Sequence, residues 1–127
     1  MGARADLTDS EVVRVVIDPV QPAHRGGLGT DAVNGAVIAG LFDVAIGIVG
    51  HFQTIGQRAG TAHLGIQYLR PLVGNRVVVE ARLVKAGANL VFATAEALDA
   101  DGTVCARAEG IVAVSGIGKT GTTSHSL

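Results

Sequence analysis

Residues 31–50 read DAVNGAVIAGLFDVAIGIVG, a nearly unbroken run of small and apolar side chains. Asp31 or Asn34 is suited to cap the N-terminus of a helix that runs to about Gly50. Because apolar residues occupy every face of this helix, the rest of the protein must cover most of it. Asp43 interrupts the run, and a carboxylate buried without a partner costs several kcal/mol. Asp43 therefore either faces solvent or is kept in an apolar place for its chemistry.

The composition indicates one compact domain with a single core. The chain has 127 residues, of which 48% are hydrophobic, and we assign residues 1–115 to the domain. The stretch GIGKTGTTSHSL at 116–127 predicts a disordered tail. The one cysteine, Cys105, excludes an internal disulfide and fits a reducing cytoplasm.

Charge and composition argue against nucleic acid and membrane as partners. The net charge is −1, and the chain has three Phe, one Tyr and no Trp, so neither phosphate neutralisation nor base stacking is supported. Residues 33–49 are near the lower length limit for a membrane span and have no basic flank, which favours a buried helix. The N-terminal MGARADLTDSE has no apolar segment, so we expect no signal peptide and a cytoplasmic location.

Strand signals lie on both sides of the helix. EVVRVVI at 11–17 is rich in β-branched residues and predicts a first strand, and the loop 18–30 follows it. Residues 53–60 are polar and predict a second loop. Four strand-like runs come next, at 63–72, 76–87, 89–102 and 103–115. This order predicts an α+β domain in which one antiparallel sheet curls around one long central helix.

The run NGAVIAGLFDVAIGIVG resembles the helix motif of the hotdog-fold acyl-CoA thioesterases, in particular the phenylacetate-degradation and hydroxybenzoyl-CoA branch. In that family a His-Gly-Gly triplet opens the helix and an Asp or Glu follows nine residues after the His. Here Asn34-Gly35-Ala36 occupy the triplet and Asp43 lies at the matching spacing. IQYLRPLVGNRVVVEARLVKAG and DADGTVCARAEGIVAVS resemble the family's later strands. The chain departs from the family at the triplet, where Asn34 replaces His and Ala36 replaces the second Gly, and at Gly87-Ala88, which replace a frequent Gly-Arg pair.

The resemblance implies a hotdog fold, an acyl-CoA substrate, a homodimer or homotetramer, and no cofactor beyond the CoA of the substrate. Thioester hydrolysis needs a donor to the carbonyl oxygen and a group that activates water or attacks the carbonyl. The first amides of a helix have no partner within it, and Gly35 offers such an amide without an obstructing side chain. Asp43 can act as general base or as nucleophile. The resemblance also places Thr61 where its hydroxyl would hold Asp43 or the attacking water.

Helix geometry separates the two catalytic groups. At ~1.5 Å per residue, Gly35 and Asp43 lie ~12 Å apart along one helix, so one carbonyl cannot touch both. Asn34 is nine steps of ~100° from Asp43, which places it on the opposite face; it either caps the helix or donates to the thioester oxygen. If both Gly35 and Asp43 serve one site, a second chain must supply one of them, and a two-fold dimer would have two such sites.

Other polar residues complete the set of candidates. His24 lies in the loop before the helix and is a candidate substrate contact. His63 lies two residues beyond Thr61 and is therefore expected on the same face of the strand. No two histidines have metal-ligand spacing, so we expect no metal. Three cations in or beside the later strands are candidate contacts for the CoA phosphates: Arg70, Arg82 and Lys85.

Two other functions fit the same fold. A hydratase or dehydratase of acyl thioesters would pair a histidine with an acid, and GHF at 50–52 is similar to one such motif, although it follows the helix. A non-catalytic acyl-CoA-binding module is favoured by Asn34 in the position of the family histidine.

Overall fold

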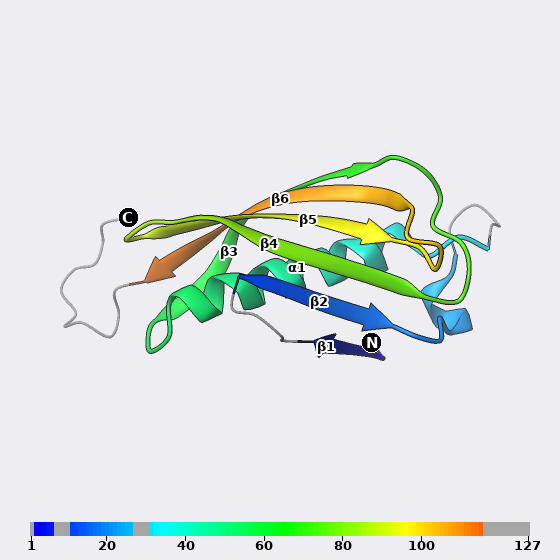
Figure 1. Cartoon of the computed structure of the whole chain (residues 1–127), viewed down its shortest axis with the longest axis horizontal. Helices are drawn as coiled ribbons and strands as arrows, with labels where there is room; N and C mark the ends of the chain where they lie inside the picture. Colours follow the sequence, from blue (N-terminus) through cyan, green and yellow to red (C-terminus); the bar gives the residue numbers. More distant parts are fainter. Residues whose placement is uncertain (1, 7–10, 27–30, 116–127) are drawn as a thin grey trace.

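The computed structural model describes residues 2–6, 11–26 and 31–115, which form one sheet and one long helix (Figure 1). The helix α1 spans Gly35–Gln53, and a short 3-10 helix, η1, spans Pro22–His24. The strands in chain order are β1 (Ala3–Asp6), β2 (Val12–Ile17), β3 (Arg58–Tyr68), β4 (Val77–Ala86), β5 (Leu90–Leu98) and β6 (Val104–Ser115). The predicted α+β architecture with an antiparallel sheet and one long helix is confirmed.

The six strands are hydrogen-bonded in the order β1-β2-β4-β5-β6-β3, and every pair is antiparallel. Alternation along each strand separates two faces. The inner face, toward α1, carries buried Val and Ala side chains such as Val79, Ala95 and Ala108. The outer face carries charged side chains of β2, β4, β5 and β6, such as Arg14, Glu80 and Arg107. The core therefore lies between the inner face and α1.

Small residues let α1 approach the sheet closely. A Cβ added at Gly50 would lie 2.6 Å from Val112 Cγ2, and one added at Gly110 would lie 2.8 Å from Ile46 Cγ2. Neither position has room for a methyl group without movement of its neighbour. The scarcity of large aromatic residues and the abundance of Gly and Ala thus follow from close packing of the helix on the sheet.

One side of α1 remains open in the single chain. By length and composition α1 could cross a membrane, but its Leu41, Phe42 and Ile46 are fully buried against the sheet, as expected of a core helix. The opposite side is exposed at Ala36, Asp43 and Val44, and Val44 retains 46% of its accessible surface. Part of the apolar surface of α1 is therefore not covered by its own chain.

Three sequence expectations need correction or lie outside this description. Residues 58–60 form the first part of β3, although their polarity predicted a loop; they pair with β6 and stay exposed because β3 is an edge strand. The strand β1 was not predicted, because only its pairing with β2 makes ARAD a strand. The predicted tail at 116–127 lies outside the described residues.

Candidate functional site

The N-terminus of α1 has one unused amide, that is, a backbone N–H without a hydrogen-bond acceptor. Val33 N–H donates to Leu72 O (2.8 Å), Asn34 N–H to His24 O (2.7 Å) and Ala36 N–H to Asn34 Oδ1 (2.7 Å). The amides of Val37 and Ile38 both donate to Asn34 O. Within the described part of the chain, the Gly35 amide alone in this segment has no acceptor. It is an exposed donor at the positive end of a 19-residue helix.

This amide borders an apolar cleft of about 400 Å³. The end of β3 and the loop after it form one wall, and the start of α1 forms the other. The lining residues are Val33, Gly35, Ile38, Tyr68, Leu69, Arg70, Pro71 and Leu72. An apolar cleft with one directed amide suits a ligand that combines a carbonyl group with hydrocarbon.

Sequence reasoning gave Tyr68 no role at the site. Its hydroxyl donates to Gly35 O at 2.8 Å, and its ring carbons lie 3.6 Å from the position of a Cβ on Gly35. The only signal in the sequence is an aromatic residue at a strand end, three positions before Pro71. The contact with Gly35 joins residues 33 positions apart, so it becomes visible only in the folded chain.

Arg70 is the cation at the cleft. Its side chain lines the cleft and is exposed, and no carboxylate of the described residues pairs with it. Its position suits a contact with an anionic group at the cleft mouth. Of the three predicted phosphate contacts, only Arg70 is adjacent to the helix N-terminus.

Asn34 and His24 support the start of the helix. Asn34 is the N-cap of α1, and its side-chain oxygen is occupied by Ala36 N–H. His24 is buried; its Nδ1 accepts from Gln21 N–H at 2.8 Å, and its carbonyl accepts from Asn34 N–H. None of the described histidines lines the cleft of its own chain, so the single chain offers no His–acid pair there.

Asp43 lies on the open side of α1. Its side chain is exposed, and neither a hydrogen bond nor an ion pair holds it within the described residues. It does not line the cleft beside Gly35 of its own chain. The two predicted catalytic groups are therefore apart in one chain, in agreement with the ~12 Å separation along the helix.

Thr61 and His63 lie on opposite faces of β3, and the expectation that they share one face was wrong. Thr61 pairs with the buried Val112 on the inner face, whereas His63 pairs with Ile111 on the outer face. The register shifts between them, so one residue is bulged and the alternation of side chains is reset. His63 Nε2 lies 3.6 Å from the Glu109 carboxylate, away from α1.

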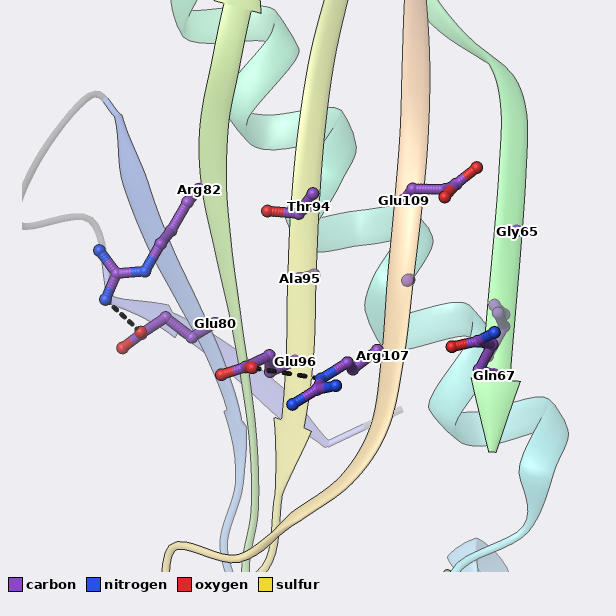
Figure 2. A pocket seen from close by; sticks show the side chains of 11 residues that line it. Gly65, Gln67, Glu80, Arg82, Thr94, Ala95, Glu96, Arg107 and Glu109 are labelled. Atoms are coloured by element: carbon purple, nitrogen blue, oxygen red, sulfur yellow. Dashed lines mark hydrogen bonds and ion pairs between the residues drawn. The ribbon is translucent and has the colours of Figure 1, made fainter. Parts of the chain in front are cut away.

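A second hollow, of about 580 Å³, lies on the outer face of the sheet (Figure 2). Both of its cations are paired with carboxylates: Arg82 donates to Glu80 at 2.6 Å, and Arg107 Nε lies 3.5 Å from Glu96. The third carboxylate of the hollow, Glu109, lies 3.6 Å from His63 Nε2. Lys85 pairs across the strands with Phe92 and so shares this outer face. Arg82 and Lys85 are thus separated by the sheet from the cleft at Gly35.

The remaining reactive group is a buried thiol. Cys105 is 1% exposed, and burial, with a smaller contribution from the Asp99 carboxylate, raises the pKa of the thiol above its ordinary value of 9.0. A neutral buried thiol is a poor nucleophile. Among the described residues, no three His, Cys, Asp or Glu side chains gather in a way that would hold a metal ion.

A comparison with protein families identifies the chain. The model of the thioesterase superfamily matches residues 31–106, which is more than half of the sequence and contains α1, β3, β4 and β5. The chain belongs to the thioesterase superfamily. A medium/long-chain acyl-CoA thioesterase of Salmonella typhimurium, YigI, is 33% identical over 90 residues. That match covers 60% of this chain and 58% of the longer relative.

Solved structures of other proteins share the fold. Thioesterase HI1161 from Haemophilus influenzae superposes with a TM-score of 0.81 over 99% of this chain and 83% of its own, at 14% identity. The PaaI protein from the phenylacetic acid degradation operon of E. coli superposes with a TM-score of 0.79, at 18% identity, over 89% of this chain and 79% of its own. The hotdog fold expected for this superfamily member is confirmed.

Proposed function

We propose that this member of the thioesterase superfamily is an acyl-CoA thioesterase. The observation that carries the proposal is the Gly35 amide, which has no acceptor while every neighbouring amide has one, in a residue that lines an apolar cleft. A preorganised donor at a helix N-terminus stabilises the negative charge that develops on a thioester carbonyl oxygen. Gly35 is therefore the group that polarises the substrate carbonyl.

Asp43 from a second copy of the chain completes the site in this proposal. The open side of α1 and the unpaired edge of β3 both support a homodimer, because each leaves a surface that another chain can cover. As general base, Asp43 takes a proton from water while the water oxygen bonds to the carbonyl carbon. The tetrahedral intermediate then expels CoA as a thiolate, which takes up a proton.

As nucleophile, Asp43 would instead bond to the carbonyl carbon and expel CoA, and water would then cleave the resulting anhydride. One turnover in H₂¹⁸O tests for the covalent route. The general-base route and cleavage of the anhydride at the acyl carbonyl both place ¹⁸O in the product acid, whereas cleavage at the Asp43 carbonyl places it in Asp43. Recovery of labelled Asp43 would identify the covalent route.

The lining of the cleft supports a substrate with an apolar acyl group. Among the lining side chains of the cleft, only those of Tyr68 and Arg70 carry polar atoms, and the others are aliphatic. The 33% identical relative is a medium/long-chain acyl-CoA thioesterase, which supports the same class. We infer that Arg70 meets a phosphate of CoA. Release of CoA thiol from a panel of short, medium, long and aryl acyl-CoAs would identify the acyl group.

Two substitutions at Gly35 test the role of its amide. Gly35→Pro replaces the N–H by a ring carbon, and proline fits the first position of a helix. Asn34 has φ −60° and ψ 134°, the extended conformation that a residue before proline adopts. We expect Gly35→Pro to lower kcat by about 10²–10³-fold, as loss of an oxyanion donor does. Gly35→Ala keeps the amide, and its Cβ would meet Tyr68 at an ordinary contact distance of 3.6 Å.

The proposal requires that Gly35→Ala retain most of the activity that Gly35→Pro loses. Equal activity of the folded Gly35→Pro variant and the natural chain would exclude the Gly35 amide as the carbonyl donor. Absence of thiol release from every acyl-CoA in the panel, with binding retained, would favour a binding module instead.

A further inference from the structure

We propose that Tyr68 is a positioning residue, which holds the Gly35 amide in the orientation that polarises the thioester carbonyl. This inference deepens the proposed function and rests on it. Tyr68 is the one residue whose side chain both lines the cleft and bonds to Gly35 in the described part of the chain.

The two peptide groups that flank the Cα of Gly35 are held from several sides. In the peptide before it, Asn34 O accepts from the amides of Val37 and Ile38. In the peptide after it, Ala36 N–H is held by Asn34 Oδ1, and Gly35 O is held by the Tyr68 hydroxyl. Glycine is the residue with the greatest backbone freedom, and helix ends fray, so external hydrogen bonds are what fix the direction of the Gly35 N–H.

Tyr68 is itself anchored to the sheet. It pairs with the fully buried Ala106 of β6, and the next two amides, of Leu69 and Arg70, both donate to Cys105 O, at 2.9 and 3.1 Å. The hydrogen bond from Tyr68 therefore joins the first turn of the helix to a paired strand. A donor held in this way needs no reorganisation as charge develops on the substrate oxygen.

The position of the hydroxyl separates this role from direct catalysis. The hydroxyl donates to a backbone carbonyl at 2.8 Å and has only one proton to give, so it is not the donor to the substrate while this bond is made. Loss of the Tyr68 hydroxyl should destabilise the bound transition state more than it destabilises the bound substrate. Such a change lowers kcat and leaves KM nearly unchanged.

A matched control exists at the other end of the same helix. The hydroxyl of Thr54, which is buried, donates to Gly50 O at 3.0 Å, so Thr54→Val removes the same type of tie from α1 far from the cleft. Tyr68→Phe and Thr54→Val therefore each delete a hydroxyl that donates to a carbonyl of α1; the Thr54 hydroxyl also lies 3.4 Å from His51 O. Only Tyr68→Phe is expected to affect the Gly35 amide.

The experiment uses two readouts on the full chain. The first is kcat and KM with the best acyl-CoA of the panel. The second readout uses a bound analogue of octanoyl-CoA in which methylene replaces the thioester sulfur, so that no turnover occurs. The infrared stretching frequency of its ¹³C-labelled carbonyl reports the hydrogen bonding to that carbonyl. We expect Tyr68→Phe to lower kcat about 10-fold, with KM within about two-fold, and to move the carbonyl frequency back toward its value in an aprotic solvent. Thr54→Val should leave both readouts at their original values, even where it lowers Tm.

Three outcomes would overturn the inference. The first is an unchanged kcat and carbonyl frequency in Tyr68→Phe. The second is a change in KM alone, which would make Tyr68 a substrate contact. The third is an equal effect of Thr54→Val on both readouts, which would indicate general loosening of α1. Failure of the proposed function looks different, because the natural chain would then neither release thiol nor shift the frequency of the bound carbonyl.

Discussion

Arg70 and Arg82 differ in their surroundings, and this difference predicts their roles. Arg70 lines the cleft beside Gly35 without a carboxylate partner among the described residues, whereas Arg82 is held by Glu80 on the outer face of the sheet. If Arg70 meets a phosphate of CoA, Arg70→Ala should raise KM about 10-fold with little change in kcat, since it removes binding common to substrate and transition state. Arg82→Ala serves as the matched control and should leave KM unchanged; the reverse pattern would move the phosphate site to the outer face.

Cys105 gives a second prediction at the residue scale. Burial raises the pKa of its thiol in the folded chain, so at alkaline pH the unfolded state releases this proton first. The contribution of Cys105 to stability is therefore fully present below pH 9.0 and declines as pH rises above that value. Cys105→Ala should flatten this alkaline decline in denaturant titrations. Rapid labelling of the native chain by a thiol reagent at pH 8 would contradict the burial on which the prediction depends.

At the scale of elements, the contact between α1 and the sheet depends on Gly50 of the helix and Gly110 of β6, neither of which has room for a side chain. Gly50→Ala would place a methyl group 2.6 Å from Val112 and should lower the free energy of unfolding by about 1–3 kcal/mol, as overpacking of a core does. Gly47, on the same helix, has no atom within 4 Å of an added Cβ, so Gly47→Ala should not lower it. Urea unfolding of both variants measures the difference; equal losses would show that helix position, not packing, decides the cost.

The sequence predicted those helices and strands whose hydrophobic pattern lies within one contiguous stretch of residues. The apolar run in 31–50 predicted a central helix, and the observed α1 ends three residues beyond the predicted Gly50. Edge strands were harder to predict. Residues 58–60 look like a loop because no face of that segment is buried in the single chain, and only pairing with β6 makes it a strand. The bulge before His63 left no signal either, because a bulge is fixed by register between strands and not by composition.

The candidate site was predictable where it depends on one helix and not where it depends on contacts between elements. Gly35 follows from its position at a helix start, and the structure shows its amide unused. The hydrogen bond from Tyr68 to Gly35 joins β3 to α1, and the different settings of Arg70 and Arg82 depend on which face of the sheet each side chain takes. None of these features is encoded in a short stretch of sequence.

At the scale of the whole molecule, the single chain holds the parts of the proposed site but does not bring them together. The Gly35 amide opens into the cleft, whereas Asp43 lies about two turns further along α1 on its open side. The unpaired edge of β3 and the exposed side of α1 are the surfaces on which a second copy would supply the missing group. A site shared in this way requires that activity depend on association.

Complementation between two inactive variants tests the shared site. Gly35→Pro lacks the amide and Asp43→Asn lacks the carboxylate, so each variant alone should lose activity by about 10²-fold or more. In a co-expressed, randomly assorted mixture, about a quarter of the sites should combine the Gly35 amide of one variant with Asp43 of the other, because each group has an even chance of being intact. Thiol release should therefore return to about a quarter of the natural rate. If both groups came from the same chain, every site would lack one of them, and the mixture would be as inactive as its parents.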